Sequence, residues 1–287
     1  MAANEKEEIK IKPFWYSDIW MFPKLITIIT TMDKDGNINA APYSHIMQYD
    51  VMTKKPRIMV GFRQDSHSFT NIKATGEFVV NCPTAEYLDD MMDTARFWPE
   101  GVNELEHTSF TQIPSRHVKP PSLAECPQIM ECTVDEIVEL PKSSGIVFAN
   151  IEAIVMDKGL KEMDRGDRIQ AMDLPIGLGD QNRRYYYHCK STSDVTMHEL
   201  EEPPGGHKGG KVTMAMPWDK EAQEGLMVVP TTMRQMVCTK VEEYAQNHGD
   251  NKVTKDRFIQ MSDEYGIDSE LMERFRTGKR LRQHLLR

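Results

Sequence analysis

Short apolar and β-branched stretches, separated by turn residues, recur over roughly the first 190 residues of the chain. The first, residues 25–31, alternates aliphatic and β-branched side chains with almost no charge, which predicts a strand buried on at least one face. A turn over residues 33–36 follows, where acidic side chains can bond local amides and Gly36 can take a positive φ. Residues 37–41 then form the return strand of a predicted hairpin. This strand ends in small residues and Pro42, which removes one amide from any ladder.

The same pattern predicts the rest of a β-rich region. Strands are expected at residues 57–62, 77–83, 129–140, 145–156 and 184–189, with a mixed connection at residues 46–55. Thr84 begins a predicted amphipathic helix over residues 85–95, and residues 97–121 form a long loop of the kind that often lies over a ligand. Six or more short strands with few helices indicate an antiparallel barrel rather than a βαβ sheet.

The pattern changes near residue 200. Residues 201–211 combine prolines with glycines and predict a linker. Helical periodicity follows, and it predicts helices over residues 219–228, from Thr231 or Thr232 to Gly249, from Thr254, and from Asp268. We therefore expect a β domain over residues 1–200, a linker over residues 201–211 and an α-helical module over residues 212–287.

Two glycine motifs match nucleotide-binding signatures only in part. Gly177 and Gly179 form a GxG, but Asn182 stands where the third glycine belongs, and no strand-turn-helix frame surrounds the motif. Residues 205–211 satisfy GxxxxGK, but Val212 replaces the required hydroxyl residue. Neither a dinucleotide-binding fold nor a phosphate loop is therefore expected.

Composition narrows the class of function. The chain is 39% hydrophobic and 28% charged, and no apolar run approaches the roughly 18 residues of a membrane helix. Residues 1–12 lack the apolar core of a secretory signal, so we expect a soluble cytoplasmic protein with no membrane partner. The net charge of −9 disfavours a sequence-independent nucleic-acid binder, which leaves small molecules and proteins as the expected partners.

The cysteines and histidines suggest no metal site. The five cysteines are scattered and never form a CxxC pair, which favours reduced, buried thiols over a metal or redox role. They are Cys82, Cys126, Cys132, Cys189 and Cys238. None of the nine histidines is assigned to a catalytic dyad.

A polar stretch over residues 64–72 carries candidate chemistry. It contains Ser66, Ser68, Thr70 and Asn71, and Arg63 and Lys73 bracket it. Hydroxyls, amides and a guanidinium together are what an oxyanion such as a phosphate monoester needs. A short helix with Ser68 as its N-cap explains the same residues equally well, so both interpretations stay open.

Three segments, taken together, resemble the flavin reductase-like family. They are residues 26–44, 68–72 and 77–83, and they correspond to the family's TTxDxxGxxNAAPxS stretch, its (S/T)xxNI turn and its GEFVVN strand. The similarity continues through residues 101–132 to residues 184–189, so it covers about residues 15–200. It implies a mainly β fold, an FMN-binding split barrel followed by a small α-helical domain.

The resemblance also implies a site. FMN would bind at a homodimer interface, with the strand end after the first hairpin against the ring and ribityl chain and the polar turn on the phosphate. Carried over residue by residue, the cofactor-binding positions are Asn39, Ala40, Ala41, Pro42, Tyr43, Ser44, Arg63, His67, Ser68, Asn71 and Asn81. His67 departs from the family, which often has an acid or another polar residue there, and Asn81 would contribute through its backbone.

The activity that the resemblance implies is that of an FMN-dependent oxidoreductase of the NAD(P)H:flavin reductase type, with NADH or NADPH as the possible donor. The flavin would carry the chemistry, so no protein acid or base is required. A flavoredoxin-like electron carrier, reduced by a protein partner, and a non-enzymatic flavin-binding assembly protein stay open as alternatives.

The helical module separately resembles the short C-terminal module of the light-independent protochlorophyllide reductase B subunit. The matching residues are Trp218, Ala222, Leu226, Val229, Pro230, Arg234, Val241, Glu242, Tyr244, Ala245, Val253 and Thr254. The similarity implies at most a docking or tetrapyrrole-associated accessory function, and the expected partner is a redox protein or a larger complex that docks through residues 212–287.

Overall fold

The chain forms two compact units, Met1–Met197 and His198–Arg287. The computed structural model describes residues 6–8, 24–50, 55–96, 98–99, 101–141, 144–181, 185–189, 212–229 and 233–265, with residues 179–181 and 185–189 described by their backbone only. The predicted linker at residues 201–211 lies outside the described residues. Each unit has its own hydrophobic core.

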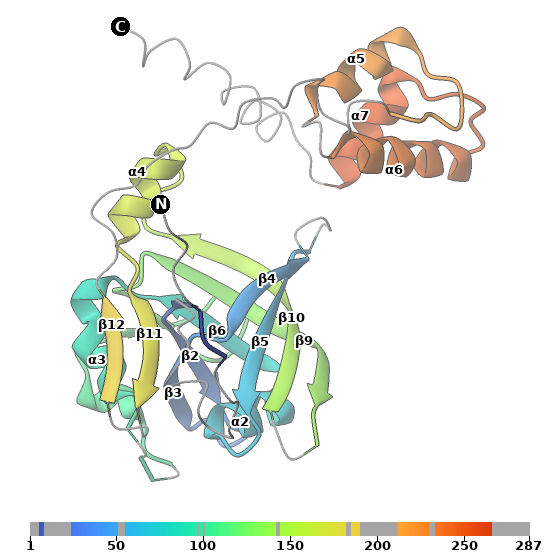
Figure 1. Ribbon diagram of the computed structural model, residues 1–287. Helices are drawn as coiled ribbons and strands as arrows, with labels where there is room; N and C mark the ends of the chain where they lie inside the picture. The colour runs from blue at the N-terminus through green and yellow to red at the C-terminus, as the bar shows by residue number, and fades with distance from the viewer. Residues whose placement is uncertain are drawn as a thin grey trace, which may run out of the picture. The chain divides into compact units, whose positions relative to one another are not determined.

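A seven-stranded antiparallel sheet forms the larger unit, in the order β3-β2-β6-β9-β10-β5-β4 (Figure 1). Its strands are β2 (Thr27–Met32), β3 (Ile38–Tyr43), β4 (Ile46–Asp50), β5 (Arg57–Arg63), β6 (Glu77–Cys82), β9 (Gln128–Glu139) and β10 (Ser144–Met156). The predicted mainly β fold is confirmed, because every strand predicted before residue 160 is present.

Two smaller sheets complete the larger unit. Strands β1 (Lys24–Leu25), β11 (Ile176–Gln181) and β12 (Tyr185–Cys189) pair in the order β1-β11-β12, and β7 (Gln112–Ile113) pairs with β8 (Ser122–Leu123). The prediction missed β11, whose glycines lower its strand propensity and whose pairing with β12 shifts register between Gly177 and Gly179. The mixed connection predicted at residues 46–55 was wrong for its first half, which is the edge strand β4.

The first hairpin has the predicted form. The Asp33 carboxylate accepts from the N–H groups of Asp35 and Asn37 at 2.8 and 2.9 Å, and Gly36 has φ 92°. The Asn37 side-chain amide also donates to this carboxylate at 2.8 Å, and that bond, together with the backbone bonds, lowers the pKa of Asp33. The return strand β3 continues past Pro42 to Tyr43, in register with Thr27. Proline is tolerated there because β3 is an edge strand of the sheet.

Both faces of the central strands are buried. On one face, Ile28 and Val79 join a cluster with the short helix α3 (Leu88–Asp93), and on the other, Ile29 and Val80 pack with α2 (His67–Thr75). The prediction of burial on at least one face is therefore confirmed, and the structure extends it to two.

Helix α2 begins two residues before the position that its sequence suggested. Its N-cap is Ser66, whose Oγ accepts from the Phe69 N–H at 3.2 Å, so the prediction of Ser68 as the cap is wrong. The Ser66 N–H bonds the Arg63 carbonyl in a turn, which starts the helix early and leaves Ser68 inside its first turn. Gly76 ends the helix in the left-handed region at φ 74°, as glycine allows.

The remaining helical pieces of the larger unit are short. The helix predicted over residues 85–95 is a 3₁₀ turn, η1 (Ala85–Tyr87), followed by α3. The predicted long loop contains a second 3₁₀ turn, η2 (Glu104–His107), and β7. Helix α4 (Arg165–Met172) was not predicted; it carries a mostly polar sequence with one buried residue, Met172.

The smaller unit packs three helices, α5 (Lys220–Val228), α6 (Arg234–Asn247) and α7 (Lys255–Glu264), around Leu226 and Val241. Glu242 is 5% exposed, and its Oε1 accepts from the Ala215 and Met216 N–H groups and from Trp218 Nε1. The predicted cap Thr254 accepts from the Arg257 N–H at 3.2 Å. Thr231, Thr232 and the helix predicted from Asp268 lie outside the described residues, and the N-cap of α6 is Met233.

Four of the five cysteines have described side chains, and these four are free and buried, as predicted. Burial raises the pKa of Cys82 to about 11 and raises those of Cys126 and Cys132 further. No helix in the described part of the chain is both long and apolar enough to cross a membrane.

Candidate functional site

The predicted site residues come from β3, β5, β6, α2 and the loops beside them, and several of them lie within hydrogen-bond distance of one another. The Asn39 amide on β3 lies 2.9 Å from Ser68 Oγ on α2, and Tyr43 Oη lies 3.5 Å from Ser66 Oγ. Asn71 Nδ2 donates to Thr31 Oγ1 on β2 at 3.1 Å. The end of β3, the end of β5 at Arg63 and the first turn of α2 therefore form one cluster, as the resemblance predicted.

Burial divides these residues into two sets. Asn39, Ala40, Ser68 and Asn81 are at most 7% exposed. Ala41, Pro42, Tyr43, Ser44 and Asn71 are half-buried, and Arg63 and His67 are exposed. The side chains of the second set are accessible from solvent, whereas those of the first set lie inside the fold.

Asn81 lies inside the sheet, in register with Ile28 on one side and Ile129 on the other. Its Nδ2 donates to Thr30 Oγ1 at 3.2 Å, and its Oδ1 accepts from the Leu123 N–H at 2.9 Å. Both the backbone and the side chain are thus engaged within the fold. We interpret Asn81 as the residue that holds β8 against the sheet, and its contact with a cofactor stays a prediction.

The first turn of α2 offers donors to an anion. The N–H groups of His67 and Ser68 have no carbonyl partner within the helix, because the first turn of any helix lacks one. Arg63 stands at the end of β5, where its guanidinium bonds Asp65 at 2.7 and 3.0 Å. Lys73, which brackets the polar stretch in the sequence, lies in the last turn and pairs with Glu139 at 3.2 Å. Arg63 therefore lies near the first turn of α2, whereas Lys73 lies at the other end of the helix.

Tyr43 connects the strand end to the core. Its ring lies 4.7 Å from that of Phe62, and burial raises the pKa of its hydroxyl. The hydroxyl reaches the cap residue of α2, so the conformation of the strand end and that of the helix start are linked through one side chain.

Glu104 belongs to this cluster, although the sequence did not indicate it. It is 5% exposed, and its Oε2 accepts from the Ala40 N–H at 2.8 Å. With the Asn39 amide turned so that its oxygen accepts from Ser68, the Asn39 nitrogen donates to Glu104 Oε1 at 3.1 Å. Burial raises the pKa of Glu104, and nearby His67 opposes that rise. Glu106, two residues on, is exposed, and no sequence pattern distinguishes the two acids.

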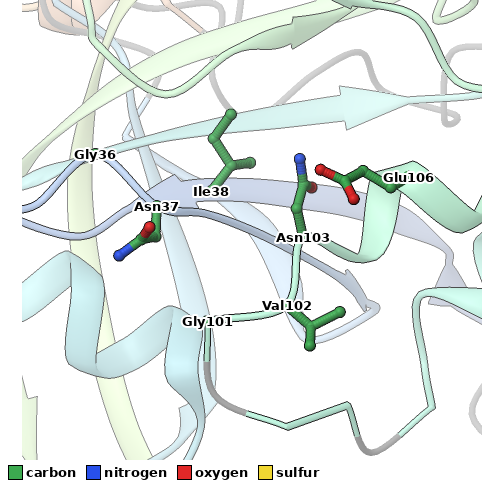
Figure 2. Close-up of a pocket in the computed structure, with 7 residues that line it drawn as sticks. All are labelled: Gly36, Asn37, Ile38, Gly101, Val102, Asn103 and Glu106. Carbon is green, nitrogen blue, oxygen red and sulfur yellow. The ribbon is translucent and has the colours of Figure 1, made fainter.

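A shallow hollow of about 420 Å³ lies beside the same 3₁₀ turn. Figure 2 shows its two sides: the hairpin residues Gly36, Asn37 and Ile38, and the loop residues Gly101, Val102, Asn103 and Glu106. None of the predicted cofactor-binding residues lines it, so the hollow and the predicted site share no residue.

Comparison with known proteins identifies a family for the larger unit. The sequence model described as "Flavin reductase like domain" matches residues 20–188, more than half of the chain. This match confirms the predicted resemblance over the larger unit. It ends before the helical module, whose own resemblance stays a prediction.

Two curated relatives are uncharacterized proteins. One, from Methanothermobacter thermautotrophicus, is 39% identical over 119 residues, which is 42% of this chain and 55% of the relative. The other, BH2278 from Halalkalibacterium halodurans, is 30% identical over 131 residues, or 44% of this chain and 61% of the relative. The matched region thus spans less than two thirds of either relative.

Solved structures share the fold. Nitrilotriacetate monooxygenase component B from Bacillus cereus aligns with a TM-score of 0.58 at 20% identity, over 68% of this chain and all of that one. Flavoredoxin from Methanosarcina acetivorans aligns with 0.55 at 18%, over 68% and 97%. A split barrel domain protein from Shewanella frigidimarina aligns with 0.53 at 20%, over 63% and 87%. The larger unit is therefore a split barrel, as predicted.

Proposed function

This chain belongs to the flavin reductase-like family, and we propose that it is an FMN-binding oxidoreductase of the NAD(P)H:flavin reductase type. One observation carries the proposal. The end of β3, Arg63 and the first turn of α2, which are separate in sequence, come together within the matched domain. The small residue Ala41, beside Pro42, suits the close approach of a flat ring to the backbone.

Each part of the cluster has a role in this proposal. The N–H groups of His67 and Ser68, with the Arg63 guanidinium, bind the phosphate, because a helix N-terminus favours an anion. Residues 41–44 contact the ring and the ribityl chain, and Asn71 lies beside the phosphate site. The buried side chains of Asn39, Ala40 and Ser68 lie under these contacts and support them. FMN bound there would supply the hydride or electron transfer.

An absorption spectrum of the purified chain, followed by anaerobic titration with NADH and NADPH, tests the proposal. We expect flavin absorbance to stay with the protein after addition of FMN and removal of the unbound cofactor, and bleaching of the bound flavin by one or both nicotinamides. A chain that binds FMN but is bleached only by a reduced redox protein such as ferredoxin is an electron carrier instead. If the chain binds FMN but neither a nicotinamide nor a redox protein reduces that FMN, the chain is an assembly protein. If the chain binds no FMN, the result contradicts the reductase, the electron carrier and the flavin-binding assembly protein alike.

We also propose that the large sheet pairs with a second copy of the chain through its β4 edge. Met47 and Tyr49 on β4 are 54% and 52% exposed, which is unusual for large apolar side chains on a strand. The Tyr49 ring packs at 4.7 Å on that of Phe148, a half-buried residue of β10. Met47→Arg should give a monomer in light-scattering measurements of molar mass where the unmodified chain gives a dimer. Asp35→Arg, in the exposed hairpin turn, is the control and should stay dimeric.

The helical unit is proposed to dock a redox protein or a larger complex. Its apolar core is closed around Leu226 and Val241, while Met227 and Ile259 are 47% and 45% exposed. These exposed side chains offer a contact surface of the kind that transient partners use.

A cytoplasmic location, expected from composition, stays a prediction.

A further inference from the structure

Glu104 is a buried acid that connects three segments of the cluster. Its two oxygens take the Ala40 N–H and the Asn39 amide, both on β3. Asn39 in turn bonds Ser68 in the first turn of α2. A chain of hydrogen bonds therefore runs from η2 through β3 to the helix start, and all three side chains in it are at most 7% exposed.

The position of Ala40 explains why this acid is needed. β3 is an edge strand, so alternate N–H groups point away from the sheet and need another partner. The bond to Glu104 shows that the backbone N–H of Ala40 points away from the sheet. The backbone of Pro42, two residues on, has the same orientation, but proline has no N–H. Glu104 thus supplies the partner of the last outward N–H before the predicted ring contacts.

We propose that Glu104 is a positioning residue for the phosphate end of the flavin site. Through Asn39 it fixes Ser68, and so the first turn of α2, at the place where the phosphate binds. This inference rests on the proposed flavin binding and deepens it, since it assigns a role to a residue that contacts no ligand.

A substitution can remove the negative charge of Glu104 without removing its hydrogen bonds. The groups that face it are His67 on α2 and Tyr43 on β3, with Arg63 beyond Tyr43. Glutamine at this position can accept from the Ala40 N–H and donate to the Asn39 oxygen, and the Asn39 nitrogen can then donate to Ser68 Oγ. Glu104→Gln therefore keeps every link of the chain, whereas Glu104→Ala removes two.

Titration of the full-length protein with FMN and with riboflavin, which lacks the phosphate, tests the proposal. We expect Glu104→Ala to weaken FMN binding at least tenfold and riboflavin binding less than threefold, because the defect lies at the phosphate. Glu104→Gln should restore FMN affinity to within threefold of the unmodified protein. Glu106→Ala, which truncates the exposed acid of the same turn, is the matched control and should change neither affinity by more than threefold.

Three results would overturn the inference. They are unchanged FMN binding in Glu104→Ala, an equal loss for FMN and riboflavin, and a folded Glu104→Gln that binds FMN as poorly as the alanine variant. If Glu104→Ala does not fold, Ser68→Ala at the far end of the chain of bonds decides instead. A loss confined to FMN supports the inference, and unchanged binding or an equal loss for both ligands overturns it. An unmodified protein that binds neither ligand refutes the proposed function itself.

Discussion

The protonation of Glu104 should be visible in the stability of the larger unit. Burial raises its pKa above the ordinary 4.5, so the folded protein holds a proton at pH values where the unfolded chain has released it. Its contribution to stability is therefore greatest at low pH and falls as the pH rises from about 4.5. We expect the urea midpoint of the unmodified protein to fall relative to that of Glu104→Gln between pH 4 and 7. A constant or growing difference would contradict this sign.

Gly145 is required by a close approach rather than by its backbone angles. A Cβ added there would lie 2.2 Å from Cζ of Phe69, which is fully buried on α2 and packs on Phe62. Gly145→Ala should therefore destabilise the larger unit by about 1–3 kcal/mol in urea unfolding, as overpacking of a tight core does. Ser144→Ala, at the exposed neighbour, should change stability by less than about 0.5 kcal/mol. Equal effects of the two substitutions would mean that α2 can move aside.

At the residue scale, the sequence predicted which side chains would gather and missed what holds them. Asn39 and Ser68 are 29 residues apart, and only a family pattern linked them before their hydrogen bond was seen. Glu104 could not be predicted, since its difference from Glu106 is burial, which depends on how the 3₁₀ turn packs against β3. Asn81 was assigned to the ligand because its strand matches the family, and the structure shows it bonded within the fold.

The cap of α2 holds the start of the helix whose first-turn N–H groups are the proposed phosphate donors. Ser66 Oγ accepts from the Phe69 N–H and donates to the Arg63 carbonyl at 2.8 Å, so it joins the helix start to the end of β5. Ser66→Ala should cost about 1 kcal/mol in urea unfolding, the usual value for a lost N-cap. Thr70→Ala in the same helix is the control, because Thr70 is exposed and alanine favours a helix. A loss in the control equal to that of Ser66→Ala would mean that the cap bond is not what stabilises the helix start.

Elements with a local signal were predicted, and elements without one were not. The hairpin carries its own turn chemistry in Asp33 and Gly36, so it followed from the sequence. For α2 the sequence left a helix as one of two interpretations and placed its cap at Ser68, two residues too late. Strand β4 has exposed apolar residues at Met47 and Tyr49 beside polar ones, which is an unclear pattern for a strand. It is ordered by pairing with β5, a contact that no local sequence shows.

At the scale of the whole molecule, the change in composition near residue 200 marked two units that the contacts also separate. The hydrophobic clusters of the larger unit use only residues before 175, and that of the smaller unit uses only residues after 211. Fold and family followed for the larger unit, because its motifs are specific. The role of the helical unit did not, since a closed core of ordinary helices says little about a partner.

Independent cores predict independent unfolding and a flavin site that does not need the helical unit. A chain ending at residue 200 should bind FMN within threefold of the full-length affinity and keep its urea midpoint.

Glu242→Ala makes the matching test in the intact chain, because it leaves three donors without their shared carboxylate oxygen. It should lower the stability of the helical unit by about 1–3 kcal/mol, while the exposed neighbour Glu243→Ala changes it little. A unit this small is only marginally stable. In Glu242→Ala the helical unit should therefore unfold before the larger unit, in a separate transition, and the FMN affinity should stay unchanged. Loss of FMN binding on truncation, or a shift of both transitions in Glu242→Ala, would mean instead that the two units fold and act as one.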